Sequence, residues 1–141
     1  MKIRIPAVAL ILLIAITFGY GTEPTRRILT IEQKVQRAAA DLMIGLHSEN
    51  TGLVESSIRV IAMMKLRVPS ADVEELQEEL DNLSITHCSA AIRYKAHIAS
   101  NICMNPQWFS QEYHTVPVDD ETFFIAAAKR LQEKLFGLNT Y

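Results

Sequence analysis

The stretch Glu55-Ser56-Ser57-Ile58-Arg59-Val60-Ile61-Ala62 is followed, 34 residues later, by a second copy of its pattern, Ser89-Ala90-Ala91-Ile92-Arg93-Tyr94-Lys95-Ala96. Both copies contain Ile-Arg-x-x-Ala. A period of this size is typical of repeated helix pairs, because one helix pair cannot bury its apolar face alone. The pattern therefore predicts two stacked pairs of helices.

This pattern resembles the second helix of a HEAT repeat, in which an acidic residue stands three positions before the isoleucine. Glu55, Ile58, Arg59 and Ala62 match that helix, whereas Ser89 stands at the acidic position of the second copy. The resemblance covers roughly residues 30 to 104 and implies an armadillo-type α-solenoid that binds other macromolecules and is not an enzyme. It also implies a structural ladder, that is, a row of ionic and hydrogen-bonded contacts between repeats. In this ladder Glu55 pairs with Arg59 or reaches Arg93.

Helical spacing of apolar residues predicts five helices after residue 29, and no window predicts a strand. The expected limits are Thr30 to about Ser48–Asn50, Asn50 to about Val68, Ser70 or Asp72 to about Leu83, Cys88 to Cys103, and Asp119 or Asp120 to Gly137. Capping side chains, Pro69 and Gly137 set these limits. We therefore expect an all-α domain over residues 30–141: a short right-handed α-α solenoid of two HEAT-like helix pairs plus a C-terminal capping helix. A helical bundle is the alternative.

The N-terminal segment has the layout of a secretory signal peptide. Lys2 and Arg4 precede Ala7–Phe18, twelve residues that are apolar except for Thr17, and small residues precede a cleavage point after Gly21. We expect residues 1–21 to be removed, residues 22–29 to form a flexible lead-in, and the mature protein to be periplasmic or secreted. The apolar run is short for a membrane span of about 20 residues, and an uncleaved anchor is the alternative.

The charge of the mature chain disfavours two classes of partner. The full sequence has 14 basic and 16 acidic residues. Removal of residues 1–21 takes away Lys2 and Arg4, so the mature chain has 12 basic residues and a net charge of −4. Nucleic acids and anionic membrane surfaces both require a basic footprint. We therefore expect a protein or peptide segment as the partner, no nucleic acid, no membrane contact apart from the signal segment, and a monomer.

The repeat also predicts a binding surface. If the second helix of each pair lines the concave side of the stack, exposed residues should recur with the same offset. Six residues then form a mildly basic stripe suited to an acidic or extended peptide: Arg59, Met63, Arg67, Arg93, His97 and Asn101. A solvated stripe without a partner is the alternative.

Two other surfaces each allow two interpretations. The third predicted helix carries an acidic face of Glu74, Glu75, Glu78, Glu79 and Asp81, which is either solvated or a docking patch for a basic partner. Residues 107–118 contain the aromatic residues Trp108, Phe109 and Tyr113. They form either a plug over the end of the helix stack or an exposed binding anchor.

The sequence offers few groups for chemistry. It contains no Gly-rich phosphate loop, Gly-x-Ser-x-Gly motif or His-Glu-x-x-His motif, so we expect no catalytic activity, no cofactor and no metal. Met63, Met64, Cys103 and Met104 leave a soft-metal site as an alternative, although methionine at helical spacing more often fills a core. The main hypothesis is a non-catalytic protein–protein interaction module of the cell envelope.

The alternative function is a thiol- or metal-responsive envelope protein that uses Cys88 or Cys103. These residues lie at opposite ends of one predicted helix, roughly 22 Å apart at the helical rise per residue, which is too far for a disulfide. Cys103 continues an apolar face and should be buried. Cys88 should be the reactive thiol, because a position in the first turn of a helix favours the thiolate.

Overall fold

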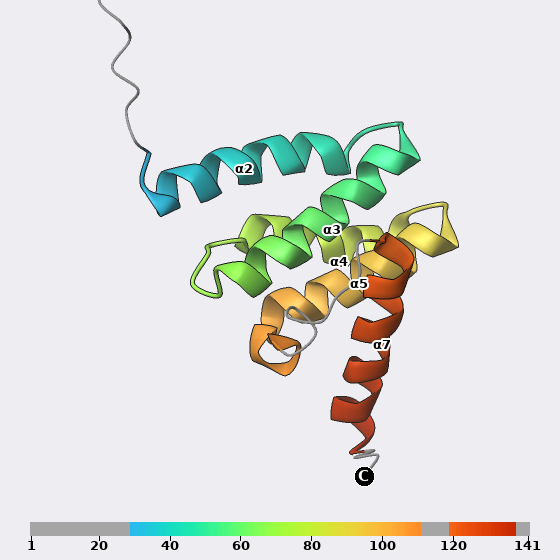
Figure 1. The fold of residues 1–141 in the computed structure, drawn as a ribbon. Helices are drawn as coiled ribbons and strands as arrows, with labels where there is room; N and C mark the ends of the chain where they lie inside the picture. The colour runs from blue at the N-terminus through green and yellow to red at the C-terminus, as the bar shows by residue number, and fades with distance from the viewer. Residues whose placement is uncertain (1–28, 111–118, 138–141) are drawn as a thin grey trace, which may run out of the picture.

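Residues 29–110 and 119–137 are described by a computed structural model, and every regular element within them is helical (Figure 1). The elements are α2 (Ile31–Leu46), α3 (Thr51–Arg67), α4 (Glu74–Thr86), α5 (Ala90–Met104), the short 3₁₀ helix η1 (Pro106–Trp108) and α7 (Asp120–Phe136). The all-α class is thereby confirmed. The expected signal peptide, residues 22–28 of the lead-in, and Tyr113 lie outside the described residues.

Side-chain caps explain where most of the described helices begin. Thr30 and Gln33 form the expected capping box on α2, with Thr30 Oγ1 accepting from the Gln33 amide at 3.3 Å. Asn50 Oδ1 accepts from the first amides of α3, and Asp119 Oδ1 accepts from the Thr122 amide at 2.9 Å. These side chains satisfy backbone donors that a helix leaves unpaired at its start. At the other end of α7, Gly137 has φ +64°, a conformation that glycine adopts without strain.

Two predicted helix starts require correction. The helix α4 begins at Glu74, and Val73 before it offers no capping side chain, although Asp72 Oδ1 accepts from the Glu74 amide at 3.3 Å. The helix α5 begins at Ala90, because the Ser89 hydroxyl caps it by accepting from the Ile92 amide. Cys88 therefore lies before α5 and not in its first turn.

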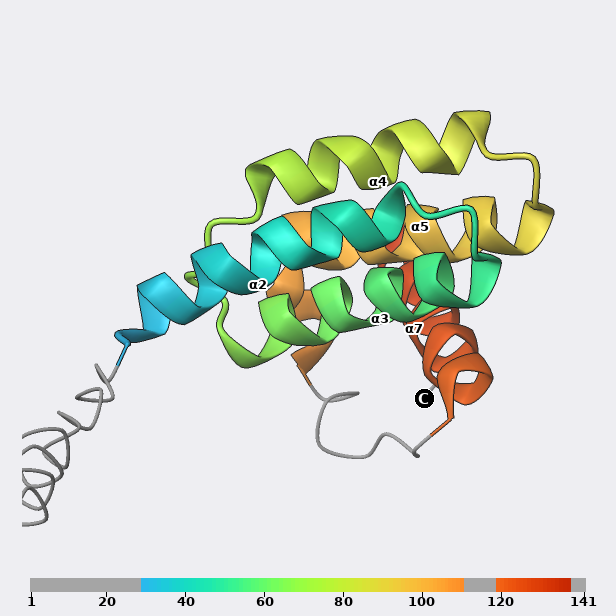
Figure 2. The same cartoon turned by 90° about the horizontal axis from the view of Figure 1, so that it is seen from above.

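The helices pack as a series of neighbours. The helix α2 packs on α3, α3 packs on α5, and α5 packs on α4, whereas α2 and α4 touch at fewer positions. Figures 1 and 2 show these four helices running roughly side by side, while α7 crosses them at a steep angle. The helix α7 packs against α5 and η1.

The repeated residues lie in the core between these helices. Ile58 and Ile92 are both 0% exposed, and so are Ala62 and Ala96 at the next repeated position. Phe109, which follows η1, is also 0% exposed, and Trp108 is partly buried against the same core. Arg130 Nε of α7 donates to the Trp108 carbonyl at 3.1 Å. For these two aromatic residues the structure supports the plug interpretation.

Candidate functional site

A groove of about 590 Å³ lies on the outer face of α3, and we call it the α3 groove. Its residues come from α3, from Val68 directly after it and from the start of α7: Ser56, Arg59, Val60, Met63, Met64, Arg67, Val68 and Asp120. Val60 is 49% exposed, and both methionines are partly buried against the core. The groove therefore combines apolar side chains with two guanidinium groups and one carboxylate.

The start of α7 is tied to α3 at one side of this groove. Arg59 Nη1 donates to Asp120 Oδ1, and the two side chains are only partly exposed. The neighbouring Asp119 caps α7, and hydrogen bonds from the Thr122 amide and hydroxyl lower the pKa of its carboxyl below the ordinary value. The chain thus holds Asp120 in the first turn of a capped helix, next to Arg59.

The α3 groove is suited to binding. Guanidinium groups form charge-assisted hydrogen bonds with carboxylates, and methionine side chains adapt to apolar groups of irregular shape. The described residues that line the groove offer one hydroxyl, Ser56, and neither a histidine nor a cysteine. The described lining residues of the groove thus present cationic and apolar side chains to any ligand that enters it.

The structure places the two halves of the predicted stripe differently. Arg59, Met63 and Arg67 all line the α3 groove. In contrast, Arg93 donates to the carbonyls of His87 and Cys88, at 2.7 and 3.0 Å, and so holds the turn before α5. His97 and Asn101 form a local contact on α5, with Asn101 Nδ2 donating to the His97 carbonyl at 2.8 Å. None of these α5 residues lines the groove.

The predicted ladder is wrong in its partners. Glu55 Oε2 accepts from Lys95 Nζ at 2.8 Å, and not from Arg59 or Arg93. Arg59 pairs with Asp120 of α7, and Arg93 donates to backbone carbonyls. An ion pair between the two copies of the pattern therefore exists, but the second copy contributes a lysine two residues after the expected arginine.

Replacing Lys95 by methionine should lower the free energy of unfolding by about 1.5–3 kcal/mol, the typical range for a hydrogen bond to a charged group. The Lys95 side chain is 15% exposed and that of Glu55 is 31% exposed, so water screens their contact only partly. Lys95 Nζ also lies 5.7 Å from the centroid of the Phe124 ring. Denaturant unfolding measures the effect, with Lys129→Met on the exposed face of α7 as the control. Equal losses in both variants would contradict the pairing.

The two cysteines differ in exposure, as predicted. Cys88 is exposed and Cys103 is buried. Burial disfavours the thiolate and raises the pKa of Cys103 from 9.0 to about 12, an effect that nearby Lys65 opposes and Asp81 reinforces. Cys88 Sγ lies 4.0 Å from His87 Nδ1, a ring atom that also accepts from the Ser89 amide at 3.0 Å.

Thiol labelling of the native protein at about pH 8 should therefore modify Cys88 alone, because reactivity follows exposure and thiolate content. Cys103 should react only after unfolding, and Cys88→Ser should abolish native labelling. The folded pKa of Cys103 exceeds the ordinary value, so this thiol stabilises the fold fully below pH 9.0 and loses that contribution as the pH rises toward about 12. Similar native labelling rates for both thiols would contradict the burial of Cys103.

The sequence alone could have identified more of the α3 groove. Ser56, Val60, Met63 and Arg67 follow helical spacing on one face of α3, and the sequence itself shows that pattern. Asp120 could not have been found in this way, because it is 61 residues from Arg59 and arrives through packing of α7.

Three further findings bear on function. No group of three or more histidine, cysteine, aspartate or glutamate side chains among the described residues could hold a metal ion. Within residues 29–110 and 119–137, no helix has the length and apolar character needed to cross a membrane. Comparison with protein-family models, curated proteins and solved structures finds no match to this chain. Function is therefore inferred from the residues of the chain itself.

Proposed function

We propose that this protein is a non-catalytic interaction module of the cell envelope, and that it binds a segment of another protein in the α3 groove. The observation that carries the proposal is that Arg59, Met63 and Arg67, three residues of the predicted stripe, line one groove together with the exposed Val60. The partner segment would be acidic and partly apolar. Its carboxylates would meet the guanidinium groups, and its apolar side chains would meet the methionines.

In this proposal the chain is a short right-handed HEAT-like α-solenoid. The pairs α2–α3 and α4–α5 are its two repeats, and α7 is the capping helix. The packing of α3 on α5 and the full burial of Ile58 and Ile92 support this arrangement. Residues 1–21 direct export, and the mature domain acts in the periplasm or outside the cell as a monomer, without nucleic acid or a cofactor.

Charge reversal tests which part of the predicted stripe binds. Arg67→Glu should lower capture of the partner from envelope extract by at least about tenfold, because an unfavourable charge at an interface costs more than 1.4 kcal/mol. His97→Glu on α5 is the matched control and should leave capture unchanged, because His97 does not line the groove. Circular dichroism would show that both variants keep their helices. Unchanged capture by Arg67→Glu would overturn the proposal.

A second candidate function is a thiol-responsive protein that uses Cys88. The exposed Cys88 thiol next to His87 Nδ1 is the observation that favours it. Cys88→Ser should then remove any mixed disulfide that forms in oxidised cells while leaving partner capture by the α3 groove intact. Absence of such a disulfide in the parent protein would rule this candidate out.

A further inference from the structure

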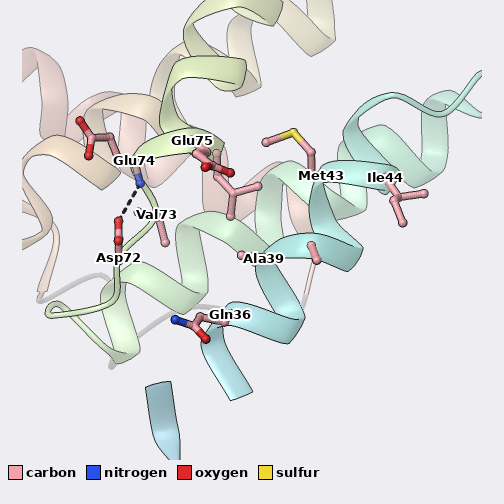
Figure 3. Close-up of a pocket in the computed structure, with 10 residues that line it drawn as sticks. Gln36, Ala39, Met43, Ile44, Asp72, Val73, Glu74 and Glu75 are labelled. Atoms are coloured by element: carbon pink, nitrogen blue, oxygen red, sulfur yellow. Dashed lines mark hydrogen bonds between the residues drawn. The ribbon is translucent and has the colours of Figure 1, made fainter. Parts of the chain in front are cut away.

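A second groove lies between α2 and the start of α4, and we call it the α2–α4 groove (Figure 3). It has a volume of about 590 Å³. Acidic residues Asp72, Glu74 and Glu75 lie along its α4 side, and its apolar surface comes from Ala39, Ala40, Met43, Ile44, Val73 and Leu76. In Figure 3, Val73 and Glu75 face the side of α2 that carries Ala39 and Met43.

Within the part of the chain that the structure describes, α2 is fully buried only at its C-terminal end. The residues of α2 that are buried are Gly45 and Leu46, whereas Val35, Ala39, Leu42 and Met43 are only partly buried. On the side of α2 that lines the groove, Ile44 is 72% exposed. The α2 residues that line the groove run from Gln36 to Ile44, roughly 12 Å of helix, so a partly exposed and mainly apolar surface about two turns long borders the groove.

The acidic side of the groove carries three carboxylates. Within the described parts of the chain, no lysine or arginine forms an ion pair with Asp72, Glu74 or Glu75. Carboxylates in the first turn of α4 are favoured by the helix dipole, which explains why the helix tolerates Glu74 and Glu75. The helix dipole does not explain why these two carboxylates lie beside an apolar groove that α2 helps to form.

We propose that the α2–α4 groove binds a basic amphipathic helix of another protein. An amphipathic helix in a groove places apolar residues spaced three and four apart on the groove floor. Lysine or arginine side chains on one flank of that helix would then lie against Glu74 and Glu75. This site has the opposite charge to the α3 groove, and its occupancy does not depend on the function proposed there.

Two synthetic helices of about 18 residues test the charge preference. They share one apolar face, and their flanks carry either lysines or glutamates. Fluorescence anisotropy with the purified protein should show saturable binding of the lysine helix. The glutamate helix should bind at least about tenfold more weakly, since a few exposed charge pairs together contribute about 1.4 kcal/mol. Equal binding of both helices, or no binding of the lysine helix, would overturn the proposal.

Surface variants locate the binding. Glu74→Lys with Glu75→Lys should weaken binding of the lysine helix by about tenfold and improve binding of the glutamate helix. Glu49→Lys with Glu121→Lys makes the same change in net charge at exposed positions outside the groove, one of them also in a first helical turn, and should leave binding unchanged. Ala40→Trp fills the groove from an exposed position and should weaken binding without changing charge.

The same variants distinguish other occupants. Equal loss of binding in the two double variants would show that net charge alone attracts the probe, which would overturn the proposal. Self-association of the protein that Ala40→Trp abolishes would assign the groove to a second copy of the chain, and would also overturn it.

Discussion

Replacing Phe109 by alanine is expected to lower the free energy of unfolding by about 3–5 kcal/mol, the range for deleting a buried aromatic side chain. Phe109 is 0% exposed and immediately follows η1, which contacts α3, α5 and α7. Its removal would leave a cavity at the point where α7 joins the other helices. The change should therefore affect the position of α7 as well as global stability.

Denaturant unfolding of Phe109→Ala and Phe109→Leu measures this effect, with the leucine variant retaining part of the packing if the alanine variant does not fold. Phe136→Ala on α7 is the control, because that phenylalanine is 71% exposed. The control should change stability by no more than about 0.5 kcal/mol. A loss at Phe109 no larger than the loss at Phe136 would contradict the plug interpretation.

Replacing Ile58 or Ile92 by alanine should lower the free energy of unfolding by about 2–5 kcal/mol in each case. The two isoleucines occupy the same place in the repeated pattern, and both are 0% exposed. Val60 and Tyr94 also occupy equivalent places, and they are 49% and 48% exposed. Alanine at either of those positions should cost far less, which gives each isoleucine a control from its own helix.

A large loss at one isoleucine and none at the other would show that the repeated pattern does not mark equivalent core positions. Comparable losses at Ile58 and Ile92, with small losses at Val60 and Tyr94, would support the repeat. Thermal and denaturant unfolding on the four single variants would provide this comparison.

The helices and several of their limits could be predicted from the sequence because the signals are local. Thr30, Asn50 and Asp119 bond to amides within three residues, and Gly137 adopts its conformation at the end of its own helix. The start of α4 was predicted less well, because Val73 leads into it without a side-chain cap and the choice between Ser70 and Asp72 had no local signal to decide it.

The contacts between helices could not be predicted in the same way. Glu55 pairs with Lys95 and not with Arg93, because the relative rotation of α3 and α5 decides which long side chain reaches the carboxylate. The two halves of the predicted stripe were assumed to share one surface, but only its α3 half lines a groove with Asp120. Spacing within one helix identifies a face, whereas packing decides what lies opposite that face.

Site-specific photo-crosslinking from Val60 in living cells is the most direct test of the proposed binding function. Val60 is exposed in the α3 groove, and Ile85, which is 79% exposed near the end of α4, serves as the control position. A crosslinker at position 60 should yield one dominant adduct with another protein, Arg67→Glu should abolish that adduct, and a crosslinker at position 85 should not form it. The same adduct from both positions, or an adduct at position 60 that persists in Arg67→Glu, would contradict binding in the α3 groove.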